Sequence, residues 1–400
     1  MNILKIRNDF KILQKQIDGK KLLYFDNACM TLKPIPVINA MNEYYENFTS
    51  CAGRSIHKLG TQVTLRYAES REKIQKFINA KHSKEVIFTK NTTESINLVA
   101  HTLNLQEGDV VLTTDKEHNS NLIPWHLQKK IRKINHEVVV SNPDNTFNLE
   151  HFEQMMNSKV KLVSMTHTSN LDGTCIDAKE MIKIAHEYDA LVLLDGAQST
   201  PNKPIDVQKL DVDLFAFSFH KMLGPTGVGI LYGKQHILEE LEPFIVGGDT
   251  VKTSSYQSHT LLDLPEKFEA GLQNYAGALG AAAAVDYLQN IGMNNIEQHN
   301  NELNTYVTDV IKNIPGLCII GPKNPKKRGS ILSFTVEKGE PHDIAMLLDK
   351  ENIMVRSGVF CVHSWFNAHK IPGAIRVSFY LYNTKEEARK LVETLNDILT

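Results

Sequence analysis

Short apolar runs alternate with amphipathic runs through the middle of the chain. Residues 109–114, 161–166 and 190–195 read DVVLTT, KLVSMT and ALVLLD, and each run has the length of a strand. Between them, segments such as 178–188 (AKEMIKIAHEY) repeat apolar residues at the spacing of a helix with one buried face. Strands that are apolar on both faces and alternate with helices predict βαβ units around a mostly parallel sheet.

The pattern changes after about residue 292. A long polar helix is expected first, then strand patterns such as 330–336 (SILSFTV), and finally an amphipathic helix at 384–399. This mixture is typical of a smaller α+β unit. We therefore predict an α/β protein with a large domain over residues 20–292 and a small α+β domain formed by residues 1–19 and 293–400.

The composition narrows the class of protein. The chain has 400 residues, of which 42% are hydrophobic, and its 44 Lys and Arg nearly balance its 46 Asp and Glu. This balance gives no basic field, so neither nucleic acid nor a membrane surface is expected as a partner. No run of about 18 apolar residues occurs, and charged residues interrupt the N-terminal segment, so we expect a cytoplasmic protein.

The five cysteines are scattered along the chain, at positions 29, 51, 175, 318 and 361. Their spacing predicts neither a disulfide framework nor a structural metal site. A functional cysteine would therefore act alone, as a thiol. Cys175 and Cys318, in the segments LDGTCID and GLCII, are expected to be packing residues.

Two charged residues lie where a parallel sheet binds its ligands. Asp195 ends an apolar strand and precedes a glycine turn, which places its carboxylate at the carboxyl end of a buried strand. Lys221 follows the aromatic strand 212–218, where burial would lower the pKa of its amine and make it a nucleophile toward aldehydes. Asp195 alone could be a helix cap, and Lys221 alone could be a surface lysine. These explanations fit the two residues together less well.

An acid at a strand end and a buried amine match the needs of pyridoxal phosphate. The carboxylate keeps the pyridinium nitrogen protonated, and the lysine binds the aldehyde as a Schiff base. Thr92 and Thr93, at the start of an expected helix, offer N–H groups and hydroxyls to a phosphate. Helix capping would explain these threonines equally well, so the cofactor prediction rests on the combination.

A series of motifs runs in order along almost the whole chain: DNA at 26–28, RSIH at 54–57, TTESINLVA at 92–100, EHNSNLIPW at 117–125, HTSNLDGT at 167–174, DGAQ at 195–198, the run 206–233, FEAG at 268–271 and RSGVFC at 356–361. The series resembles the class V aminotransferases, and specifically their cysteine desulfurase and selenocysteine lyase branch. The resemblance implies the fold of the pyridoxal-phosphate-dependent transferases (fold type I), pyridoxal 5'-phosphate as cofactor, and a homodimer.

The resemblance also implies roles for single residues around the cofactor. Lys221 is similar to the Schiff-base lysine, Asp195 to the partner of the pyridinium nitrogen, and Gln198 to the residue that hydrogen-bonds the ring hydroxyl. His118 resembles the imidazole that stacks on the ring. The phosphate ligands would be Thr92, Thr93, Ser218 and His220, and the substrate-binding residues Asn170, Arg356 and Arg376. An arginine suits this last role because its planar fork matches a carboxylate.

Cys361 decides between the reactions that this cofactor supports. It lies five residues beyond Arg356, where the resembling branch carries its sulfur-accepting cysteine. The thiolate would attack the sulfur of L-cysteine, giving L-alanine and an enzyme persulfide on Cys361. A glycine-containing loop beside an arginine favours an exposed, acidified thiol. The function implied is a cysteine desulfurase that passes sulfur to an acceptor protein for iron–sulfur cluster or thiolation pathways.

Three departures from the family pattern concern the surroundings of the site. Cys29 lies in the segment DNACM, and Leu272 replaces a threonine that commonly reaches the phosphate of the partner subunit. Val359 and Phe360 replace two histidines, so that His363 is the nearest imidazole.

Two alternative functions stay open at this point. One is a selenocysteine lyase or another pyridoxal-phosphate-dependent C–S lyase, with L-selenocysteine as a possible substrate and no need for Cys361. The other is an inactive scaffold for a sulfur-acceptor protein, which the presence of Lys221 and Asp195 argues against.

Overall fold

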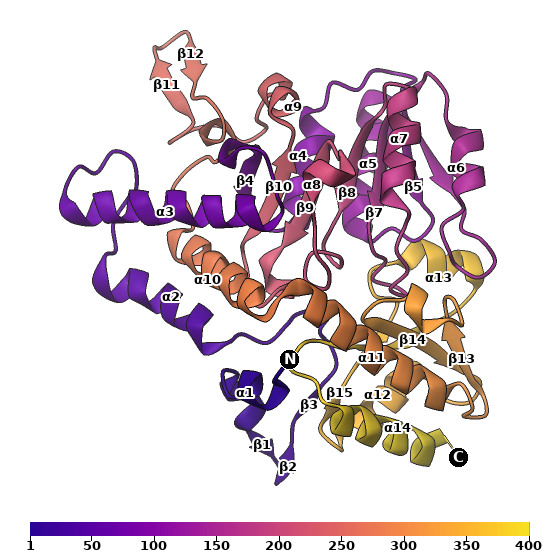
Figure 1. The fold of residues 1–400 in the computed structure, drawn as a ribbon. Coiled ribbons are helices and arrows are strands. Elements are labelled where there is room, and N and C mark those ends of the chain that lie inside the picture. Colours follow the sequence, from indigo (N-terminus) through magenta and orange to yellow (C-terminus); the bar gives the residue numbers. More distant parts are fainter. Residues whose placement is uncertain (400) are drawn as a thin grey trace.

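The computed structural model describes residues 1–399, which form a large and a small unit (Figure 1). The central sheet of the large unit has seven strands: β4 (Val86–Thr89), β5 (Val110–Thr114), β6 (Asn135–Val139), β7 (Val160–Thr166), β8 (Leu191–Asp195), β9 (Leu214–Ser218) and β10 (Gly229–Gly233). Its helices are α2 (Ile35–Asn47), α3 (Lys58–Phe77), α4 (Thr92–Thr102), α5 (Ile123–Arg132), α6 (Leu149–Met155), α7 (Ala178–Glu187), α8 (Val207–Leu210), α9 (Gln235–Glu240) and α10 (Tyr275–Ile291).

The sheet is mostly parallel, which confirms the prediction from the alternating runs. Its strand order is β4-β10-β9-β8-β7-β5-β6. The strands from β9 across to β6 pair in parallel, whereas β10 runs antiparallel to both of its neighbours, β9 and β4. The carboxyl ends of β5, β7, β8 and β9 therefore meet at one edge of the sheet.

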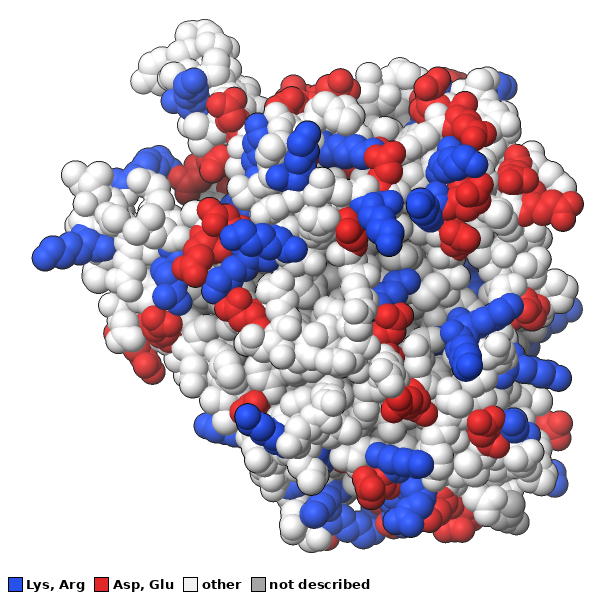
Figure 2. Space-filling view, in the orientation of Figure 1, with Lys and Arg blue, Asp and Glu red and all other residues white. Residues whose placement is uncertain are grey.

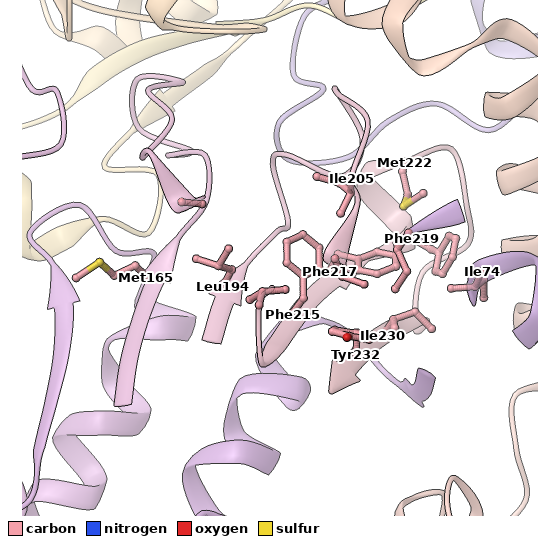
Figure 3. Packing of buried hydrophobic residues seen from close by; sticks show 14 of the residues in the cluster. Ile74, Met165, Leu194, Ile205, Phe215, Phe217, Phe219, Met222, Ile230 and Tyr232 are labelled. Carbon is pink, nitrogen blue, oxygen red and sulfur yellow. The ribbon is translucent and has the colours of Figure 1, made fainter. Parts of the chain in front are cut away.

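Alternate side chains of the strands enter two separate cores, one on each face of the sheet. Leu194, Phe215 and Phe217 pack with residues of α3, α7 and α10. Figure 3 shows these three side chains together with Ile74 of α3. Leu193 and Leu214, their neighbours along the same strands, pack instead with residues of α4, α5 and α9. Because both faces are covered, these strands are buried along almost their whole length and are apolar up to their last residues, Asp195 and Ser218, as is typical of a buried parallel sheet.

The small unit contains a four-stranded antiparallel sheet with the order β13-β14-β17-β16. Its elements are α11 (Met293–Ile311), β13 (Leu317–Ile320), β14 (Ile331–Val336), α12 (Pro341–Asp349), β15 (Ile353–Met354), β16 (Arg356–Gly358), α13 (His363–His369), β17 (Ala374–Ser378) and α14 (Lys385–Leu399). Before the large unit, the chain forms α1 (Ile3–Arg7), β1 (Gln16–Ile17), β2 (Lys20–Lys21) and β3 (Leu23–Tyr24).

The N-terminal segment packs against the small unit. Arg7 forms an ion pair with Glu387 of α14 at 2.7 Å, and β3 pairs in parallel with β15. Residues on both sides of the expected boundary at residue 20 therefore contact the C-terminal unit. The division at residues 20 and 292 stays a prediction.

The exposed surface mixes charges of both signs over the face shown in Figure 2. Within residues 1–399, no helix is both long enough and apolar enough to cross a membrane. A two-stranded hairpin, β11 (Val251–Ser254) and β12 (His259–Leu261), projects from the large unit (Figure 1).

Cys175 and Cys318 are exposed, so the prediction that they are packing residues is wrong. Cys318 lies on β13, an edge strand on which side chains alternate between the two faces. Leu317 and Ile319 pack against the core of the small unit, and Cys318 takes the opposite face. An apolar sequence context did not reveal which face the cysteine would occupy.

Candidate active site

The carboxyl edge of the sheet and the small unit enclose a cavity of about 470 Å³. This volume is typical of sites for small molecules and cofactors. The cavity is lined by every site residue assigned from the sequence: Thr92, Thr93, His118, Asn170, Asp195, Gln198, Ser218, His220, Lys221, Arg356, Cys361 and Arg376. The structure thus brings these residues together, while their roles toward a ligand stay predictions.

Asp195 and Lys221 lie at the buried side of this cavity. Asp195 is the last residue of β8, and its Oδ1 accepts a hydrogen bond from the backbone N–H of Ala197 at 2.9 Å. Gly196 makes this turn possible, because a Cβ at this position would lie 2.2 Å from the ring of Phe215. Lys221 ends the short 3₁₀ turn Phe219–Lys221, directly after β9.

Burial shifts both groups toward their neutral forms. It raises the pKa of the Asp195 carboxyl, and the nearby Lys221 cation opposes this shift. It also lowers the pKa of the Lys221 amine, which Asp195 in turn opposes. Part of the Lys221 surface is open to the cavity, so its amine is both accessible to a ligand and easier to deprotonate than an exposed lysine.

His118 follows β5 and lines the same cavity. Burial, together with the positive charges of Lys221 and Arg376, lowers the pKa of His118 to about 3. Its Nδ1 accepts a hydrogen bond from the backbone N–H of Ser120 at 3.1 Å. The imidazole is therefore neutral near pH 7, with its proton on Nε2.

The first turn of α4 forms one end of the cavity. Asn91 caps this helix by accepting a hydrogen bond from the N–H of Glu94 at 3.0 Å. The Thr92 hydroxyl lies 2.6 Å from the hydroxyl of Ser218, at the end of β9, and the Thr93 hydroxyl lies 2.7 Å from that of Ser120. Hydroxyls and N–H groups at a helix N-terminus form an environment that suits a phosphate.

Two arginines that line the cavity lie close to Asp26. Arg356 Nη2 lies 3.2 Å from Asp26 Oδ2 and also donates to the Cys29 sulfur, while Arg376 Nη2 lies 3.6 Å from Asp26 Oδ1. Arg376 Nη1 donates to the backbone carbonyl of Asn170 at 3.0 Å. The Nε of Arg376 is buried and has no hydrogen-bond partner among the described residues. Arg376 therefore lines the cavity with one donor that has no partner among the described residues, whereas Arg356 contacts two side chains.

The Asn170 side chain also makes a hydrogen bond within the protein. Its Nδ2 donates to the backbone carbonyl of Phe360 at 2.7 Å, directly before Cys361. In this structure the side chain thus holds the loop that carries the cysteine, a contact that the sequence did not suggest.

Cys361 is an exposed free thiol at the mouth of the cavity. It follows β16 in a turn closed by a hydrogen bond from the N–H of Val362 to the carbonyl of Val359 at 2.8 Å. Phe360 packs its ring under the guanidinium of Arg376, 4.8 Å from the ring centroid. The loop position and exposure expected for Cys361 are both present.

Two residues of this site were not predicted from the sequence. Asp26, which holds both arginines, occurs in the motif DNA, but nothing in the motif indicated its partners. Asn119 contacts the loop after β16, and the only available signal was its position directly after His118. Cys29 and His363, noted as departures, both line the cavity.

Residues 23–391 match the family model described as Aminotransferase class-V. The chain belongs to this family. Among curated members, it is 42% identical to a probable cysteine desulfurase of Halalkalibacterium halodurans over 99% of this chain and 97% of the relative. A probable cysteine desulfurase of Staphylococcus epidermidis is 39% identical over 98% of this chain and 96% of the relative.

Solved structures of the class V aminotransferase fold are also similar. The apo cysteine desulfurase of Thermococcus onnurineus superposes with a TM-score of 0.95 at 35% identity, covering 99% of this chain and 98% of that one. A cysteine desulfurase of Escherichia coli in an S-sulfonic acid form has a TM-score of 0.91 at 31% identity, covering both chains completely. These similarities extend over both units of the fold.

Proposed function

We propose that this class V aminotransferase is a pyridoxal-phosphate-dependent cysteine desulfurase. One observation carries the proposal: the exposed thiol of Cys361 opens into the same cavity as the buried pair Asp195 and Lys221. The pair suits a cofactor that many reactions share, and the thiol adds the group that a sulfur-accepting reaction needs. The names of its full-length relatives support the same activity.

The residues of the cavity fit pyridoxal phosphate. Lys221 would hold its aldehyde, Asp195 its ring nitrogen and Gln198 its ring hydroxyl, with the neutral ring of His118 over one face. The phosphate would lie at the α4 end, against Thr92, Thr93, Ser218 and His220. When bound, this cofactor supplies an electron sink for the substrate carbon atoms.

The residues of the chain then have distinct tasks toward L-cysteine. Arg376, which lines the cavity, binds the substrate carboxylate through its guanidinium. Lys221 takes and returns the proton at the substrate Cα, a task favoured by its lowered pKa. Cys361 Sγ attacks the substrate sulfur: an S–S bond forms and the Cβ–S bond breaks. The electron pair of the broken Cβ–S bond stays with Cβ, which takes up a proton. L-alanine then leaves, and the persulfide remains on Cys361.

The test is Cys361→Ser in the holoenzyme, with Cys51→Ser as the control. The serine variant should bind pyridoxal phosphate normally but form alanine from L-cysteine at least ~100-fold more slowly, because a hydroxyl is barely ionised at neutral pH and attacks sulfur poorly. Cys51 is exposed and outside the lining of the cavity, so its variant should keep the wild-type rate. Mass spectrometry of the wild type should find one added sulfur on the Cys361 peptide.

Two outcomes would contradict this assignment. One is added sulfur on Cys29, and the other is a full rate of Cys361→Ser on L-cysteine. Selenide release from L-selenocysteine should survive the substitution, because selenium leaves more readily and does not require the thiol. A variant that is active on both substrates would favour the C–S lyase alternative.

A homodimer and a sulfur-acceptor protein complete the proposal. The family resemblance implies the dimer, and exposed apolar side chains near the projecting hairpin support it. They include Tyr256 at the hairpin tip and Leu272, 69% exposed. Light scattering should give twice the mass of one chain, and a monomer would contradict it. Delivery of the sulfur to iron–sulfur or thiolation pathways, and a cytoplasmic location, stay predictions.

A further inference from the structure

The turn that carries Cys361 has an uncommon backbone. Phe360 and Cys361 have φ angles of 51° and 60°, in the left-handed region that residues with a Cβ rarely adopt. Consecutive residues in this conformation persist only where their surroundings hold them. The contacts that hold this turn therefore determine how the thiol is presented to the cavity.

Two residues of the large unit bind the carbonyl groups of the turn. Asn170 Nδ2 donates to the carbonyl of Phe360, and the backbone N–H of Asn119 donates to the carbonyl of Cys361, each at 2.7 Å. Asn119 directly follows His118. A single residue therefore joins the segment beside the cofactor site to the turn that presents the nucleophile.

The side chain of Asn119 makes a second contact with the same loop. Its Nδ2 lies 2.9 Å from Nδ1 of His363, which begins α13 and lines the cavity. An amide nitrogen only donates hydrogen bonds, so Nδ1 of His363 accepts, and the neutral ring carries its proton on Nε2. His118 and His363 both line this cavity.

We propose that Asn119 is a positioning residue for sulfur transfer to Cys361, an inference that rests on the proposed desulfurase function. Its backbone N–H holds the turn in the left-handed conformation. Its side chain holds the imidazole of His363 with the Nε2 proton available to the cavity. That proton can donate a hydrogen bond to sulfur and so stabilise the thiolate of Cys361 that attacks the substrate.

The experiment measures how fast a persulfide forms on Cys361 after the holoenzyme is mixed with L-cysteine. Asn119→Ala should slow this step about five- to ten-fold, the usual effect of losing one hydrogen bond. His363→Ala should slow it at least as much. The double variant should lose no more than His363→Ala alone, because both changes act through the same ring. The KM for L-cysteine and the absorbance of the bound cofactor should stay at their wild-type values.

Asn295→Ala is the matched control. Asn295 is exposed on α11, outside the lining of the cavity, and its Nδ2 makes one comparable hydrogen bond, to the carbonyl of Ile291 at 2.7 Å. This variant should form the persulfide at the wild-type rate. An unchanged rate in Asn119→Ala, a raised KM alone, or losses that add in the double variant would overturn the inference. If the wild type itself formed no persulfide on Cys361, the proposed function would fail instead.

Discussion

Single residues at the Arg376 end of the cavity differ in how much hydrogen-bonding capacity they keep for a substrate. Arg356 contacts both Asp26 and Cys29, and its side chain is 43% exposed. Arg376 is almost fully buried, lies further from Asp26, and keeps its Nε without a partner among the described residues. A buried donor without a partner is costly unless a ligand satisfies it. Arg376 is therefore the arginine that we propose for the substrate carboxylate.

We predict that Arg376→Lys raises the KM for L-cysteine about ten-fold or more and leaves the absorbance of the bound cofactor unchanged. An ammonium cannot match the two oxygens of a carboxylate as a guanidinium does, a loss of roughly 1–3 kcal/mol. Steady-state kinetics measure the effect. Arg389→Lys, on the exposed side of α14, is the control and should keep the wild-type KM. Equal KM values for the two variants would place the carboxylate elsewhere.

The residues that could be predicted from the sequence are those whose role depends on local context. Asp195 and Lys221 follow apolar strands, and the ends of such strands are known ligand positions. The pairing of Asn119 with His363 could not be predicted, because it joins residues 244 positions apart across the two units. The ion pair between Arg356 and Asp26 could not be predicted for the same reason.

The first turn of α4 links local stability to the proposed cofactor site. The Asn91 side chain caps this helix, and Thr92 and Thr93 begin it beside the cavity. The alternation of apolar runs was sufficient to predict the parallel sheet. It could not reveal the antiparallel direction of β10, because strand direction depends on how the chain crosses the sheet rather than on the strand itself.

We predict that Asn91→Ala lowers the free energy of unfolding by about 1 kcal/mol, the usual effect of losing a cap, and also weakens the binding of pyridoxal phosphate. Urea unfolding and cofactor titration measure the two effects. Asn148→Ala is the control, because Asn148 caps α6 with a hydrogen bond of the same length, 3.0 Å, outside the lining of the cavity. It should lose stability without losing cofactor affinity. If both variants lost the same cofactor affinity, the loss would not depend on the Asn91 cap beside the phosphate site.

Histidines with different surroundings contribute to how the stability of the fold depends on pH. Burial, followed by the charges of His126 and Lys129, lowers the pKa of His136 to about 4. A hydrogen bond to Asp213 is the main cause that raises the pKa of His186, with the two side chains 2.8 Å apart. Protonation in acid therefore destabilises the fold at one site and stabilises it at the other.

We predict opposite pH dependences for His136→Gln and His186→Gln. Between pH 4 and about 6.5, the unfolded chain binds a proton at His136 and the native chain does not, so this site removes up to about 1.4 kcal/mol of stability for each unit of falling pH. His136→Gln should therefore gain stability relative to the wild type as the pH falls through this range. The His186 contribution is complete below about pH 6.5 and is lost as the pH rises through its raised pKa, so His186→Gln should be most destabilised in acid. Urea unfolding of the three proteins at several pH values, with pyridoxal phosphate in excess, measures both differences. Parallel curves for the two variants would show that these histidines do not control the pH dependence of the fold.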